Sequence, residues 1–161
     1  MKAKKTNAMR ILDQKKVSYE MHEYSSDAIH VDGIHVADQI NKPHEQVYKT
    51  IVLQNDNQHY VALIPVDEHI DLKKAAKGFK VKRLELLHVK ELFDLTGYVR
   101  GGCSPIGMKK AFPTLIDDAA LKLDTIIVST GKIGQQIEIN PTDLKSVTRA
   151  TFCDITQKSA D

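Results

Sequence analysis

The chain has 161 residues, of which 42% are hydrophobic and 27% are charged, and its net charge is only +2. This length favours one domain over 1–161 with a sizeable core, and the small charge does not by itself indicate nucleic-acid binding. No apolar run approaches the roughly 20 residues that span a bilayer. The basic start "MKAKKTNAMR" lacks the apolar segment of a secretory signal, so we expect a cytoplasmic protein that binds no membrane.

The first half of the chain predicts two helices and three strands. Thr6 is a plausible cap for the first helix, and the second helix stops before Pro43. The connection "NDN" between two apolar runs indicates a hairpin, whose second strand is apolar on both faces and therefore central. Helices are expected over 1–15 and 34–41, and strands over 17–24, 46–54 and 58–66.

The second half is richer in strands. Asp71 is well placed to cap a helix, Gly97 to end one, and Pro141 to open one. Helices are expected over 72–77, 89–95 and 141–147, and strands over 98–102, 113–118, 124–130, 136–140 and 150–155. Without a regular alternation of strand and helix, this pattern predicts an α+β fold with a largely antiparallel or mixed sheet.

Lys49 lies in the middle of an expected strand, "QVYKTIVLQ". With a period of two, it shares a face with Val47, Ile51 and Leu53, where an ammonium is costly to desolvate. Taken alone, the lysine fits either a side chain that extends along the strand to water or a side chain that meets an anionic or polar ligand.

Basic residues gather in two segments, "DLKKAAKGFKVKR" and "GMKKAF". Such clusters fit contacts to phosphate groups, and they fit a solvated helix face equally well. Lys73, Lys74 and Lys77 belong to the first segment, and Lys109 and Lys110 to the second.

The ordinary signatures of metal and cofactor sites are missing from the sequence. The seven histidines show no ligand spacing, so we expect no metal and no cofactor. Cys103 and Cys153 are expected to be free thiols. The segment "STGKIG" lacks the first glycine and the Ser or Thr of a phosphate loop, so we expect a turn that offers backbone amides.

The segment "RGGCSPIG" replaces bulky strand residues with small ones. A glycine pair permits close approach of another molecule or marks a bulge, where freed amides suit an oxyanion. A tight structural bend is an equally good interpretation. Cys103 as a nucleophile is a further possibility, although no histidine lies nearby in the sequence.

Together, "QVYKT", "IDLKK", "TGYVRGGCSPIG" and "STGK" resemble the signatures of the YbaK/EbsC family over nearly the whole chain. These free-standing proteins are similar to the editing insertion domain of bacterial prolyl-tRNA synthetase. The resemblance implies a mixed, barrel-like sheet flanked by short helices. The implied activity is hydrolysis of the ester in mischarged aminoacyl-tRNA, above all Cys-tRNA(Pro).

The resemblance also implies roles for individual residues. Lys49 matches the family's essential lysine, which holds the aminoacyl end, and the substrate's own thiol acts as nucleophile. The implied substrate-binding residues are Tyr24, Thr50, Gly101, Gly102, Cys103, Ser104, Pro105, Ser129, Thr130 and Gly131. The expected tRNA contacts are Lys73, Lys74, Lys77, Lys109, Lys110 and Lys132. Cys103 and Gln136 depart from the family pattern, in which an aliphatic residue and an aspartate are common at these places.

The sequence therefore predicts a deacylase that edits mischarged tRNA in trans, with tRNA(Pro) favoured and prolyl-tRNA synthetase as a candidate partner. Three alternatives stay open. One is a non-catalytic module that binds a nucleotide or the tRNA end. Another is a deacylase that removes Ala or Ser with water as nucleophile. The third is a thiol enzyme that uses Cys103.

Overall fold

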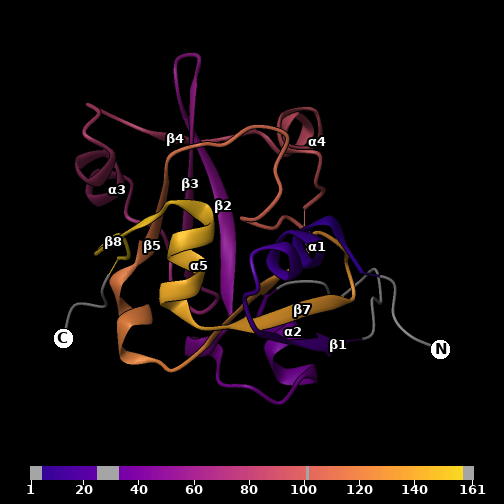
Figure 1. Cartoon of the computed structure of the whole chain (residues 1–161). Coiled ribbons are helices and arrows are strands. Elements are labelled where there is room, and N and C mark those ends of the chain that lie inside the picture. The colour runs from indigo at the N-terminus through magenta and orange to yellow at the C-terminus, as the bar shows by residue number, and fades with distance from the viewer. Residues whose placement is uncertain (1–4, 25–32, 101, 158–161) are drawn as a thin grey trace.

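The computed structural model describes residues 5–24, 33–100 and 102–157 and contains short helices around two sheets (Figure 1). The α-helices are α1 (Asn7–Gln14), α2 (Gly33–Gln39), α3 (Leu72–Phe79), α4 (Val89–Thr96) and α5 (Pro141–Thr148), and the 3₁₀ helices are η1 (His44–Gln46) and η2 (Asp118–Lys122). The strands are β1 (Tyr19–Glu23), β2 (Tyr48–Asn55), β3 (Gln58–Pro65), β4 (Glu85–Leu86), β5 (Thr114–Asp117), β6 (Ile126–Ser129), β7 (Gln135–Ile139) and β8 (Thr151–Cys153). The expected α+β class is confirmed.

The strands form a small sheet and a large sheet. The small sheet has the order β1-β7-β6 and is antiparallel, whereas the large sheet has the order β4-β2-β3-β5-β8 and is mixed. A parallel bridge between Val47 and Ile127 joins β2 to β6. The flanked mixed sheet that the resemblance implied is therefore present, and the strands of the described residues do not close into a barrel.

The β2–β3 hairpin forms the centre of the molecule (Figure 1). Its tight turn at Asp56 and Asn57 was expected, and β3 is central and buried on both faces, as predicted. One face packs into a core with α1 and the small sheet through residues such as Val61 and Leu63. The other face packs against α3 through Ala62 and Ile64. Successive side chains of β2 therefore point alternately toward the core with α1 and toward the core with α3.

The predicted helix caps are confirmed. The Thr6 hydroxyl accepts a hydrogen bond from the Met9 amide at α1, and the Asp71 carboxylate accepts from the amides of Lys73 and Lys74 at α3. Gly97 ends α4 with φ +85°, a conformation that favours glycine. No helix of the described residues is long and apolar enough to cross a membrane.

One predicted element is wrong. Residues 98–100 and 102 form no strand, although "YVRGG" predicted one. The chain leaves α4 through the left-handed Gly97, and the Gly102 amide donates back to the Val99 carbonyl at 3.0 Å. This local turn uses an amide that a sheet ladder would need, so the segment is a loop.

Candidate functional site

Lys49 lies on the face of β2 that the sequence predicted. It pairs with Ile64 of β3 and shares its face with Ile51 and Leu53, which pack in the α3 core. Val47, on the same face, packs with Val66 and Ile127. The lysine is therefore partly buried at the border between two apolar clusters.

A parallel bridge between Val47 and Ile127 joins the start of β2 to the small sheet. Within that sheet, Ser129 pairs with Gln136, and Gln136 pairs with His22. Paired residues point to the same side of a sheet, so these three form a line that we call the polar row. The sequence does not reveal the row because its members come from three strands.

A cleft of about 1410 Å³ opens along β2, and Lys49 and Thr50 both line it. Ile34 of α2 contributes from one side, and residues of β4 and α4 contribute from another. The lining is largely aliphatic, and its other polar residues are His69, Asp71, Lys73, Arg100 and Gln157. The cleft therefore offers apolar walls with a few polar groups of both charges, which suits an organic ligand that carries polar oxygens.

Burial disfavours the protonated, charged form of the Lys49 side chain. Desolvation lowers the pKa of its ammonium, and the carboxylates of Asp67 and Glu68 offset part of that lowering. Among the described residues Lys49 has no ion-pair partner within 4.0 Å. A partly desolvated ammonium without a close counter-ion is costly for the folded protein and is well suited to meet a ligand.

Four buried side-chain polar atoms have no hydrogen-bond partner within the described structure. They are the hydroxyls of Tyr24, Tyr48 and Thr50 and the amide oxygen of Gln136. Tyr48 and Thr50 alternate with Lys49 along β2, and Tyr48 packs in the core with α1. Gln136 belongs to the polar row. Tyr24 follows β1 on the side of His22, and its amide donates to the Gly134 carbonyl at 2.9 Å.

The small-residue segment forms a tight loop, and we call residues Gly102–Gly107 the glycine loop. Gly101 lies outside the described residues. The Ser104 hydroxyl is fully buried and accepts from the Ile106 amide at 3.2 Å. Pro105 is buried between them. The Gly102 amide donates to Val99, so this amide is not a free oxyanion donor.

Cys103 is buried in the glycine loop, where it is only 7% exposed. Burial raises the pKa of its thiol to about 12, although a hydrogen bond with Thr96 acts in the opposite direction. The thiolate, and not the thiol, is the nucleophile of cysteine enzymes. At neutral pH Cys103 is therefore protonated, which argues against the thiol-enzyme alternative.

Ser129, Thr130 and Gly131 begin the segment Ser129–Gly134, which we call the late turn. The Ser129 hydroxyl accepts from the Gly131 amide at 3.2 Å, and the Thr130 hydroxyl donates to Gln135 at 3.5 Å. Gly131 adopts φ +99°, which favours glycine. The late turn touches the glycine loop, because a Cβ on Gly102 would lie 3.2 Å from the Ile133 amide nitrogen.

The predicted tRNA-contacting lysines have different surroundings. Lys73 is exposed and lines the cleft, and Lys77, Lys110 and Lys132 are exposed. Lys109 lies 5.4 Å from the centre of the Phe93 ring and donates to the Asp94 carbonyl.

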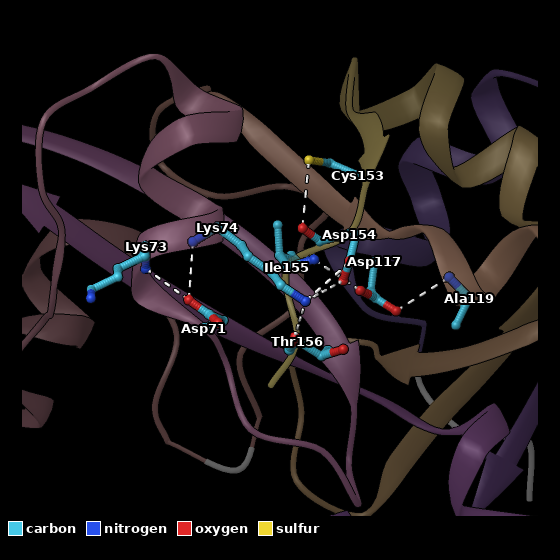
Figure 2. Close-up of polar contacts among 9 residues, drawn as sticks. All are labelled: Asp71, Lys73, Lys74, Asp117, Ala119, Cys153, Asp154, Ile155 and Thr156. Carbon is cyan, nitrogen blue, oxygen red and sulfur yellow. Dashed lines mark hydrogen bonds and ion pairs between the residues drawn. The ribbon is translucent and has the colours of Figure 1, made fainter. Parts of the chain in front are cut away.

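Lys74 is already engaged by the protein, as Figure 2 shows. Its ammonium forms an ion pair with Asp154 at 3.1 Å and donates to the Thr156 carbonyl at 2.9 Å. Lys74 therefore ties α3 to the C-terminal segment. The sequence could not reveal this because the partners are 80 and 82 residues away.

Two groups of side chains in the described structure have the spacing of metal ligands. They are Glu20, His22 and Glu138, and Asp117, Asp118 and Asp154. In each group, one carboxylate is already bound by other groups of the protein. Glu138 accepts from Thr125 at 2.6 Å and contacts His22 and Lys42, while Asp117 accepts from the amides of Ala119 and Ile155. These two carboxylates are therefore held by hydrogen bonds and ion pairs within the protein.

Two residues at the site were not predicted. Arg100 lines the cleft, and the only available signal was its position directly before the glycine pair. Tyr98 contacts both the glycine loop and the late turn. Its place beside Gly97 gave no sign of these contacts, which come from separate segments.

Comparison with known proteins gives consistent findings. Residues 33–147 match the family model described as the aminoacyl-tRNA editing domain. The chain is 44% identical over 155 residues to a protein of Enterococcus faecalis provisionally named Cys-tRNA(Pro)/Cys-tRNA(Cys) deacylase EbsC, covering 96% of this chain and 94% of that protein. It is 28% identical over 93 residues to a proline–tRNA ligase of Syntrophus aciditrophicus, covering 58% of this chain and 16% of the ligase.

A solved structure shares the fold. It is described provisionally as a trans-editing enzyme for prolyl-tRNA synthetase and superposes with a TM-score of 0.82, covering 96% of this chain and all of that one. At 20% sequence identity, this likeness concerns the fold.

Proposed function

The chain belongs to the aminoacyl-tRNA editing-domain family, and on that premise we propose that it is a deacylase that hydrolyses the ester of mischarged tRNA in trans. We propose Cys-tRNA(Pro) as the main substrate, with the cytoplasm as the compartment and prolyl-tRNA synthetase as a partner. The name of the Enterococcus relative supports this choice of substrate. The partial match to a proline–tRNA ligase supports the link to that synthetase.

The placement of Lys49 is the single observation that best supports catalysis in the cleft. Its side chain is partly buried, lines the cleft and has no ion-pair partner within 4.0 Å among the described residues. We assign Lys49 to the aminoacyl-adenosine end, where it positions the ester through a charge-assisted hydrogen bond. Thr50 lines the same cleft, and we assign it as a second contact to this end.

Charge develops on the carbonyl oxygen as the ester is attacked. Preorganised backbone amides stabilise such an oxyanion at low cost, and we propose that the glycine loop supplies them. The Gly102 amide is engaged with Val99, so the donor has to be another amide of this segment. An aminoacyl ester is already activated, and positioning with electrostatic stabilisation supplies most of what the reaction requires.

The nucleophile in this proposal is the thiol of the cysteinyl substrate. Its sulfur forms a bond to the ester carbonyl carbon, the bond from that carbon to the ribose oxygen breaks, and this oxygen takes up the proton that the thiol releases. Water then opens the resulting cyclic thioester and gives free cysteine. The protonated state of Cys103 is consistent with a nucleophile that comes from the substrate. An alanyl or seryl ester would need water instead, and one methyl or hydroxyl group changes pocket affinity by only about 1–3 kcal/mol.

Single-turnover deacylation of Cys-, Ala- and Ser-charged tRNA(Pro) tests the proposal. We expect fast release of cysteine by the wild type and a rate lower by about 10²–10³-fold in Lys49→Ala, the loss typical of one preorganised donor. Lys145→Ala, which removes an exposed lysine from α5, is the matched control and should retain the wild-type rate.

The substrate panel separates the alternatives. Release of alanine or serine, and not of cysteine, would overturn the substrate and require a water nucleophile. No hydrolysis of any ester, with the tRNA still bound, would overturn catalysis and favour a binding module.

A further inference from the structure

Tyr98 connects the glycine loop to the late turn. Its hydroxyl donates to the Ile106 carbonyl at 2.6 Å, which attaches it to the glycine loop. A Cβ built on Gly131 would lie 2.5 Å from the Tyr98 ring, so the ring occupies the place of a side chain in the late turn. A Cβ on Gly107 would lie 3.0 Å from the Tyr98 hydroxyl. One side chain therefore fills the space between the glycine loop and the late turn.

The backbone of Tyr98 is itself fixed. The Thr96 hydroxyl, which is 1% exposed, accepts from the Tyr98 amide at 3.0 Å and donates to the Leu92 carbonyl at 2.8 Å. Leu92 lines the cleft from α4. A continuous set of contacts thus runs from α4 through Thr96 and Tyr98 to both segments.

We infer that Tyr98 is a positioning residue that holds the glycine loop against the late turn and thereby sets the geometry of the proposed ester site. This inference rests on the proposed function for its catalytic consequence. Tyr98 acts through backbone that it fixes, whereas Lys49 and the loop amides meet the substrate.

The glycines in this region follow from the same contacts. Gly131 has φ +99° and no room for a Cβ beside the ring, and Gly107 has φ +79° with Asn7 and Tyr98 close to the place where a Cβ would lie. The direct contact of Gly102 with the late turn is close backbone packing. Without the tyrosine ring, this packing would lose its support, and the two segments would separate.

Tyr98→Leu and Tyr98→Phe test the inference. Leucine removes the ring and the hydroxyl, and we expect the single-turnover rate to fall about 10²-fold, because a displacement near 1 Å costs on that order. Affinity for tRNA should change less than about threefold, because uniform binding contacts are kept. Phenylalanine keeps the ring against Gly131 and should restore most of the rate.

Tyr60→Leu is the matched control. Tyr60 is 9% exposed, and its ring packs on Phe79 with ring centres 4.8 Å apart in the α3 core, away from both segments. This variant also loses a buried tyrosine ring and should lose stability while it keeps the wild-type rate. Equal rate losses in Tyr60→Leu and Tyr98→Leu would overturn the inference, because general destabilisation would then explain both.

Amide hydrogen exchange tests the same inference without any activity. The amides of Ile106 and Gly131 are bonded within the glycine loop and the late turn. In Tyr98→Leu their exchange should accelerate while amides in β3 stay protected, and Tyr60→Leu should show no such local change. Unchanged or evenly accelerated exchange would overturn the inference. Failure of the proposed function would leave this readout intact.

Discussion

Two partly buried lysines show how this protein treats charge in two different regions. Lys74 meets the Asp154 carboxylate and the Thr156 carbonyl and closes a connection between α3 and the C-terminal segment (Figure 2). Lys49 faces the cleft with a pKa lowered by burial and with no ion-pair partner among the described residues. The charge of Lys74 is paired within the protein, whereas we propose that the charge of Lys49 is paired by a ligand.

The polar groups around the two lysines differ in the same way, because those near Lys74 are hydrogen-bonded and one beside Lys49 is not. Near Lys74, both carboxylate oxygens of Asp117 accept backbone amides, from Ala119 and Ile155. Next to Lys49 in β2, the Thr50 hydroxyl is buried without a hydrogen-bond partner within the described structure. Buried polar groups that have hydrogen-bond partners support the fold, whereas buried polar groups without partners are a cost that a binding site tolerates.

Asp117→Ala should give the largest loss of stability among substitutions near Lys74. It leaves the amides of Ile155 and Ala119 without an acceptor, and a buried unpaired donor costs about 1–3 kcal/mol. Urea unfolding at pH 7 measures the change. A stability equal to the wild type would mean that these hydrogen bonds do not support the fold.

Lys49→Met should instead raise the free energy of unfolding. The folded state holds Lys49 with a lowered pKa, so the protonated ammonium is a cost that methionine removes, and we expect a gain of about 0.5–2 kcal/mol. Between the lowered folded pKa and the ordinary 10.5, the unfolded chain binds more protons. Wild-type stability should therefore rise toward that of the variant as the pH increases through this window. Thermal unfolding from pH 7 to 10 measures both effects, and a less stable variant would contradict the account.

Lys74→Met should have a smaller effect. The ammonium and its partner are each about one-third exposed, and partly solvated ion pairs contribute about 0–1 kcal/mol. We expect a loss within that range, which should shrink at high salt because ions screen the pair. A loss that is independent of salt would show that packing of the side chain, and not the ion pair, matters here.

Cys103→Ala should have the smallest effect on catalysis. Burial raises the pKa of this thiol to about 12, so it is not a nucleophile near neutral pH. We expect the deacylation rate to fall at most about tenfold, against the fall on the order of 10⁶-fold that follows loss of a true nucleophile. Single-turnover rates on Cys-tRNA(Pro) decide between these values, and a loss of the larger size would restore the thiol-enzyme alternative.

Local signals explain how much of the fold could be predicted. The caps Thr6 and Asp71, the β2–β3 hairpin and the left-handed Gly97 are set by residues close in sequence, and all are confirmed. The strand predicted over 98–102 is wrong because the Gly102 amide bonds locally to Val99. Its alternating pattern did not reveal this turn.

The candidate site was predictable only in part. The period of β2 placed Lys49 on the correct face, because alternation along a strand is local. The pairing of Ser129 with Gln136, and the bridge that joins their sheet to the start of β2, are tertiary contacts that no local pattern reveals. The contacts of Tyr98 with Ile106 and Gly131 depend in the same way on tertiary packing.

The most direct test of the central claim measures rate and stability together for wild type, Lys49→Met and Lys145→Met. The account predicts that Lys49→Met hydrolyses Cys-tRNA(Pro) about 10²–10³-fold more slowly than wild type while it is at least as stable, and that Lys145→Met matches wild type in rate. A Lys49→Met protein that keeps the wild-type rate, or that loses rate only in proportion to its loss of folded protein, would contradict the claim that this lysine serves the ligand.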